Sequence, residues 1–188
     1  MWWRNNRVAL GHAFRINAVI AIAGLNAACF QPLYASKTIN GGPGLGTALA
    51  QVQIERIDAP NGTTDSRVAG EIESALDFEL QGGGGLISPT HKLKVRMGLN
   101  RQTIITDVLT GRVEAEITGI EASFTLTELA SGKAVMQGRT FSRVSSDYPG
   151  QQQRFARVRA RIDAENRAAK VAAENIRTRL ASYFVAGT

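Results

Sequence analysis

The chain has 188 residues, of which 44% are hydrophobic and 20% are charged, and it carries 22 basic and 16 acidic side chains. This composition excludes a chain that is intrinsically disordered throughout. Three basic residues and no acidic residue lie in the first 28 positions, so the remainder carries 19 basic against 16 acidic side chains. Such a small excess does not indicate a nucleic-acid-binding protein. The remaining length, about 160 residues, suits one domain with a substantial core.

The first 28 residues have the layout of a secretory signal peptide. Three arginines precede an apolar stretch, Ile16 to Leu25, which is followed by the small residues Ala27 and Ala28. An apolar run of about ten residues is too short to cross a membrane, because a spanning helix needs about 20. We therefore expect residues 1–28 to be a cleaved signal.

Cys29 is the only cysteine, and it directly follows Leu25-Asn26-Ala27-Ala28. A single cysteine excludes a disulfide within the chain. Two small residues before a cysteine resemble the lipobox of bacterial lipoproteins, although Asn26 stands where the lipobox has an aliphatic residue. The resemblance implies a Cys29 that carries lipid. The alternative is a free, buried cysteine behind an ordinary cleaved signal.

Residues 29–46 are predicted to form the acylated cysteine and a flexible tether. Four glycines and Pro43 fall between positions 41 and 46, and these residue types interrupt regular structure. An ordinary surface loop is compatible with the same composition. Residues 47–188 are expected to form a single domain.

The domain begins with a predicted strand and a predicted helix. Apolar and polar residues alternate from Gln51 to Ile57, which favours a short strand. From Arg67 to Gln81 apolar residues recur three and four positions apart, which predicts an amphipathic helix after the capping residues Thr63 to Ser66. Gly82 to Gly85 should end this helix. The glycines follow a helix and lack a Gly-Lys-Ser/Thr ending, so they do not predict a phosphate-binding loop.

Three strands are expected next, at His91 to Thr106, Val113 to Glu128 and Ala134 to Arg143. The short turns between them predict an antiparallel meander. In the middle strand the alternation changes phase at Gly119, which predicts a β-bulge there.

A long amphipathic helix is predicted from Gln151 to Phe184. The arginines on its polar faces are typical of a solvated surface with local ion pairs, and the alternative is a contact with nucleic acid or an anionic surface. Together these elements predict an α+β fold with a four-stranded, mostly antiparallel sheet, two helices packed on one face, and the order β-α-β-β-β-α.

No catalytic or metal-binding group of residues can be identified. His12 lies in the signal and His91 stands alone, so the mature chain has no His pair or Cys-His pair. The acidic pairs Asp77 with Glu79 and Glu114 with Glu116 are explained as exposed charges. We therefore expect neither an enzyme nor a bound cofactor or metal.

Two segments, near the start and at the end of the mature chain, carry a family resemblance that extends, with the order of the elements between them, over nearly the whole chain. Cys29-Phe30-Gln31-Pro32-Leu33-Tyr34 is similar to a Cys-Gly-Phe-x-Pro-Leu-Tyr start, with Phe30 in the place of the usual Gly. The ending from Ala164 to Ala169 and from Ile176 to Phe184 also fits, including its Arg-Leu-Ala-x-Tyr-Phe pattern. In these features the chain resembles the lipopolysaccharide-assembly lipoprotein family LptE, in its alphaproteobacterial form.

The resemblance implies a transport role without catalysis. Proteins of this family sit as a plug inside the barrel of the outer-membrane protein LptD, help it to assemble and assist delivery of lipopolysaccharide to the outer leaflet. The implied partners are an LptD-type β-barrel, lipopolysaccharide, and outer-membrane lipid through acylated Cys29, with no nucleic acid. The implied location is the outer membrane, lipid-anchored, facing the periplasm or enclosed by the barrel. An aromatic Phe30 after the cysteine, rather than an acid, permits release to that membrane.

Lys94, Arg96 and Arg139 are candidate lipopolysaccharide-binding residues. They alternate away from the apolar side of the predicted sheet, and cationic side chains there would attract the phosphates of a polyanionic lipid. The alternative is that they are simply the solvent-exposed face of a half-covered sheet.

Two other functions stay open. One is an auxiliary lipoprotein of an ABC-type phospholipid transport system, and the other is a soluble basic binding module. An LptE protein should retain a large β-barrel through detergent extraction, whereas a soluble module should be released without detergent.

Overall fold

The structure is a computed structural model that describes residues 43–109, 111–148 and 154–186. The chain divides into two units, Met1–Ala35 and Ser36–Thr188, and all described residues belong to the second. The predicted signal peptide, Cys29 and the tether before Pro43 lie outside the described residues.

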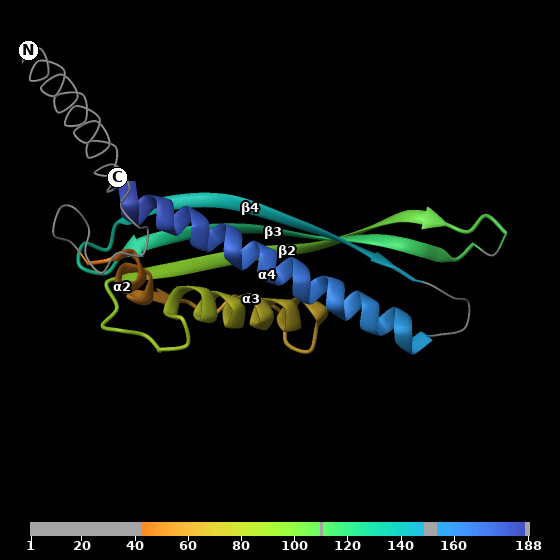
Figure 1. The fold of residues 1–188 in the computed structure, drawn as a ribbon, viewed down its shortest axis with the longest axis horizontal. Coiled ribbons are helices and arrows are strands. Elements are labelled where there is room, and N and C mark those ends of the chain that lie inside the picture. The colour runs from red at the N-terminus through yellow and green to blue at the C-terminus, as the bar shows by residue number, and fades with distance from the viewer. Residues whose placement is uncertain (1–42, 110, 149–153, 187–188) are drawn as a thin grey trace, which may run out of the picture. The chain divides into compact units, whose positions relative to one another are not determined.

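The described elements form the predicted α+β fold with one additional helix (Figure 1). The sheet order is β1-β2-β3-β4, with β1 parallel to β2 and the other pairs antiparallel. The mostly antiparallel four-stranded sheet is therefore confirmed. In chain order the elements are α2 (Leu45–Ala50), β1 (Val52–Ile54), α3 (Thr64–Gln81), β2 (His91–Thr106), β3 (Val113–Glu128), β4 (Ala134–Asp147) and α4 (Arg154–Ala186).

The additional helix α2 begins two residues before the predicted start of the domain. Leu45 and Gly46, which we assigned to the tether, are its first residues. The side chains of Leu45 and Leu49 are only 4% and 2% exposed and belong to the main hydrophobic core. The packed part of the domain therefore begins at Leu45.

Both ends of α3 carry the signals expected from the sequence. The side chain of Thr63 accepts a hydrogen bond from the backbone N–H of Ser66 at 3.2 Å, which caps the first turn. Gly82 follows the helix with φ of 59°, a left-handed conformation that glycine adopts at little cost, and its N–H donates to the carbonyl of Phe78. The helix starts three residues before the predicted Arg67, because Thr63 rather than Ser66 is the cap.

One face of the sheet is apolar and lies against the helices. Leu93 and Val95 of β2 pair with Leu126 and Phe124 of β3, and all four side chains are buried. Val68, Ile72, Leu76 and Leu80 complete the core from α3. This arrangement confirms that two helices cover one face of the sheet.

Helix α4 packs through alanines. Ala168, Ala169, Ala172 and Ala173 are fully buried, and Ile176 and Leu180 continue the same stripe. Small side chains let the helix backbone lie close to both the sheet and α3. Within the described residues, no helix is long and apolar enough to cross a membrane.

The predicted bulge at Gly119 is wrong. Gly119 pairs regularly with Asn100, and the register shifts of this hairpin lie between Thr103 and Thr106 instead. The row of Ile120, Ala122, Phe124 and Leu126 continues without a phase change through Thr118 and Glu116. A Cβ at position 119 would lie 2.2 Å from the side-chain oxygen of Asn100, so a larger residue there would require the exposed side chain of Asn100 to move.

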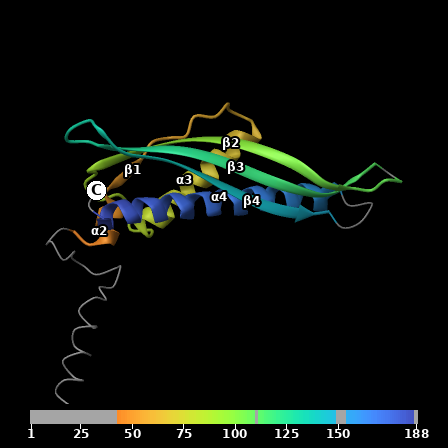
Figure 2. The ribbon, with the colours of Figure 1, turned by 90° about the horizontal axis from the view of Figure 1, so that it is seen from above.

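Strand β4 is four residues longer than predicted and runs to Asp147. Its added residues pair with the start of β3, where Ala115 lies opposite Asp147. As a result β2, β3 and β4 are all long, and the β2–β3 hairpin continues past the first turn of α4 (Figures 1 and 2). β1 is shorter than predicted, since only Val52 to Ile54 pair with β2.

Candidate ligand-binding face of the sheet

The sheet face opposite the helices carries the three predicted site residues. Arg96 of β2 lies opposite Ser123 of β3, and Ser123 lies opposite Arg139 of β4. These three residues therefore form one row across the sheet, because paired residues point to the same face. Lys94 occupies the neighbouring row, beside Thr125.

Arg96 and Arg139 flank a shallow hollow. Neighbouring strands are about 4.8 Å apart, so the two arginine Cα atoms lie on the order of 10 Å from each other, with Ser123 between them. The hollow has a volume of about 350 Å³, and Gly98, Glu121 and Phe141 also line it. Within the described part of the chain, both guanidinium groups are exposed and make no ion pair. Two free cations thus converge on one small depression.

Lys94 differs from the two arginines because an acid already meets its charge. Its ammonium group lies 3.5 Å from Glu55, and Lys92 lies 3.3 Å from the other oxygen of the same carboxylate. The hydrogen bond from Lys92 is the largest cause that lowers the pKa of Glu55. The structure therefore brings Arg96 and Arg139 together and leaves Lys94 at the margin of the hollow.

Phe141 is a member of this face that the sequence analysis did not identify. Its ring is 67% exposed, and the guanidinium of Arg143 lies over it, 5.6 Å from the ring centre. The sequence pattern could have identified Phe141, because Arg139, Phe141 and Arg143 alternate in β4 and therefore lie on the same face of the sheet. An apolar phenylalanine is not expected on a solvent-exposed face, so the pattern was not assigned to it.

The chemistry of this face suits an anionic, partly apolar ligand. Two guanidinium groups can donate several charge-assisted hydrogen bonds to a phosphate, and an exposed ring can pack on a sugar or a hydrocarbon. Glu121 offsets one of the two arginines, so the lining of the hollow carries a net charge of about +1, and Arg143, over the ring of Phe141, adds one more positive charge to this face. Among the described residues there is no cluster of three or more His, Cys, Asp or Glu side chains that could hold a metal.

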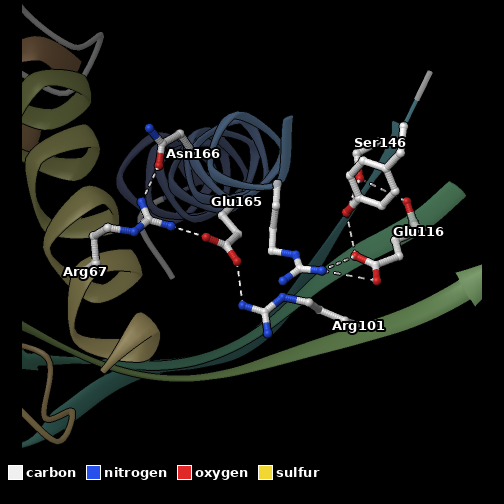
Figure 3. Close-up of polar contacts among 8 residues, drawn as sticks. Arg67, Arg101, Glu116, Ser146, Glu165 and Asn166 are labelled. Atoms are coloured by element: carbon white, nitrogen blue, oxygen red, sulfur yellow. Dashed lines mark hydrogen bonds and ion pairs between the residues drawn. The ribbon is translucent and has the colours of Figure 1, made fainter. Parts of the chain in front are cut away.

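A second polar group of residues lies inside the helix-covered face (Figure 3). Glu165 of α4 is 2% exposed and forms ion pairs with Arg67 of α3 and with Arg101 of β2. Asn166 accepts a further hydrogen bond from Arg67 at 2.7 Å. One buried carboxylate thus joins three elements, and its role is to position them.

A similar network surrounds Glu116, which we had explained as an exposed charge. Its side chain is 12% exposed and accepts hydrogen bonds from Tyr148 at 2.5 Å and from Arg161 at 3.3 Å. The pKa of Arg161 is raised, first by the interaction of its own guanidinium with Tyr148 and then by the negative charge of Glu116. Glu116 therefore fastens the start of α4 to the sheet, and the exposed-charge interpretation is wrong for this residue.

Among known proteins, this chain matches solved structures but no protein family and no curated protein sequence. A candidate lipoprotein from Caulobacter crescentus CB15 of known structure matches with a TM-score of 0.58 and 22% identity, over 77% of this chain and 98% of that one. The protein thus has a fold that occurs in bacterial lipoproteins.

Two further solved structures are similar at lower scores. Rare lipoprotein B from Shewanella oneidensis has a TM-score of 0.49 and 14% identity, over 71% of this chain and 96% of that one. A minor lipoprotein from Acinetobacter baumannii has a TM-score of 0.49 and 13% identity, over 70% and 90%.

Proposed function

We propose that this protein is an outer-membrane lipoprotein of lipopolysaccharide assembly, held by lipid on Cys29, that plugs and helps to assemble an LptD-type β-barrel. The observation that carries the ligand part of the proposal is the row Arg96–Ser123–Arg139 on the exposed sheet face. The lipobox-like sequence before Cys29 and the lipoprotein fold support the anchor. The protein carries out no reaction in this role.

The proposed ligand contact follows from charge and spacing. Lipopolysaccharide carries several phosphates, and a phosphate above Ser123 would lie within reach of both arginine side chains. Phe141 would then pack on the adjoining sugar or acyl surface. Lys94 adds long-range attraction, weakened by its pairing with Glu55.

The contact can be tested by reversing the charge of Arg96 and Arg139 together. We expect Arg96→Glu with Arg139→Glu to weaken lipopolysaccharide binding at least tenfold, since each lost charge-assisted hydrogen bond is worth about 1.5–3 kcal/mol. A matched control is Arg159→Glu with Arg179→Glu, which reverses two exposed arginines of α4 and leaves the sheet face intact. Equal binding by the two double variants would refute a role for this face.

The barrel partner requires a separate experiment. The protein, extracted from membranes in mild detergent, should retain a large β-barrel protein through purification. Recovery with components of an inner-membrane ABC-type transporter instead would favour the auxiliary-lipoprotein function. Release of the mature protein without detergent would contradict both.

A further inference from the structure

Four segments meet at one end of the domain, which we call the α2 end: residues 43–51, 82–90, 129–133 and 180–186. The backbone N–H of Ile87 donates to the carbonyl of Ala50 at 3.2 Å, and that of Leu129 donates to Thr90 at 2.9 Å. The ring of Phe184 meets His91 edge-on at 5.2 Å. Figure 1 shows α2, the β3–β4 turn and the last turn of α4 together at this end.

The α2 end is almost free of charge. Its 30 residues include a single charged residue, Lys133, although 20% of all residues in the chain are charged. The opposite end differs, since residues 104–112 and 154–163 contain seven charged residues among 19. The absence of charge is therefore a property of one end and not of the protein's loops in general.

Apolar side chains are exposed on the same surface. Leu86 and Ile87 are 42% and 51% exposed, Leu129 is 43% exposed and Val185 is 56% exposed. The ring of Tyr183 lies beside that of Phe184, with 5.4 Å between the ring centres. A surface with a single charged residue and with aliphatic and aromatic side chains suits the interface of a lipid bilayer, where apolar groups are buried and little charge needs to be desolvated.

The route of the chain indicates that this end is the one near the membrane. The described chain enters at Pro43, and thirteen residues separate it from Cys29. Such a segment reaches at most about 50 Å when fully extended, and the 16-residue strand β2 is itself about 50 Å long. With Cys29 in the bilayer, the opposite end of the domain could contact the bilayer only if residues 30–42 were fully extended along the whole length of the domain.

We propose that the α2 end lies against the lipid bilayer, with Leu86 and Ile87 inserted among the headgroups. This inference rests on the proposed lipid anchor at Cys29. The contact acts as a second attachment that fixes the orientation of the domain: the α2 end lies at the leaflet that holds the anchor, and the distal β2–β3 hairpin is the end farthest from the anchor.

The contact is tested with a fluorescent label at a single introduced thiol. Because Cys29 is the only cysteine and its sulfur carries lipid in the mature protein, Ile87→Cys supplies one reactive site. The control is Val108→Cys, at a residue that is 99% exposed in the β2–β3 hairpin tip. Each labelled full-length lipoprotein is placed in vesicles of phosphatidylethanolamine and phosphatidylglycerol whose acyl chains carry a nitroxide quencher.

We expect roughly fivefold stronger quenching at 87 than at 108, since an interfacial side chain lies about 5–10 Å inside the headgroup region. Equal quenching at both positions, or stronger quenching at 108, overturns the inference. A label at 87 that is shielded only when a protein partner or a second copy is added overturns it as well. Mass spectrometry of the amino terminus and flotation with the vesicles distinguish failure of the anchor from failure of the contact. A chain that lacks lipid and does not float contradicts the lipid anchor itself. A chain that floats but has an unquenched label at 87 contradicts only the bilayer contact.

Discussion

The buried carboxylate of Glu165 gives the sharpest test of how the domain is held together. Its side chain is 2% exposed, while Arg67 and Arg101, its partners, are 38% and 34% exposed. Glu165→Gln keeps the size of the side chain and removes its charge. Both arginines then lose their counter-charge in a partly buried place.

The magnitude follows from that burial. Removing one partner of a fully buried ion pair costs about 3–5 kcal/mol. The two arginines are each about one-third exposed and regain part of their hydration, so we expect a loss of about 2 kcal/mol in the free energy of unfolding. At a denaturant slope of about 2 kcal/mol per molar urea, the unfolding midpoint should fall by about 1 M.

Urea unfolding followed by circular dichroism measures this midpoint. The matched control is Asp163→Asn, which removes an ion pair with Arg167 on the same helix where the two side chains are 65% and 51% exposed. That change should cost less than about 0.5 kcal/mol. Equal midpoints for the two variants would refute the view that Glu165 fastens α3, β2 and α4 to one another.

Three further changes test other parts of the structure. Gly138→Ala should destabilise the protein by about 1–3 kcal/mol, because the new Cβ would lie 2.6 Å from the ring of Phe124, and a second change, Phe124→Leu, should recover part of the loss in thermal unfolding. Burial lowers the pKa of His91, against a smaller opposing effect of Glu128. His91 is therefore harder to protonate in the folded protein than in the unfolded chain, and the protein should lose stability as the pH falls below about 6.5. His91→Gln should flatten this pH dependence in urea midpoints measured at pH 7.5 and 5.5. Phe141→Ala should leave the melting temperature unchanged, since the ring is 67% exposed, and should weaken lipopolysaccharide binding about two- to fivefold; an unchanged affinity would exclude the ring from the contact.

Local patterns sufficed for the long strands. The boundaries of β2 and β3 agree with those predicted, because alternation over 16 residues and the turns on either side define them. The alternation also placed Lys94, Arg96 and Arg139 on the exposed face. Whether these residues bind a ligand stays a prediction.

Features that depend on distant contacts could not be predicted from local patterns. Arg67, Arg101 and Glu165 are far apart in the sequence, and only the packing of α3 and α4 on the sheet brings them together. Helix α2 was missed because six residues with a glycine among them carry little helical signal, and its stability comes from burial of Leu45 and Leu49.

Gly119 and Lys94 show the same limit at single residues. A glycine inside a strand indicates either a bulge or a close approach, and the contact with Asn100 shows that the second holds at Gly119. The partial neutralisation of Lys94 by Glu55 depends on the parallel pairing of β1 with β2, which no local pattern indicates.

The measurement that tests the central claim most directly is the amount of lipopolysaccharide at the cell surface after depletion of this protein. Depletion should lower surface lipopolysaccharide, and the wild-type protein should restore it. The Arg96→Glu, Arg139→Glu variant should fail to restore it, although it is produced and lipidated normally, whereas the Arg159→Glu, Arg179→Glu control should succeed. Normal surface lipopolysaccharide after depletion, with an intact barrel, would contradict the proposed function.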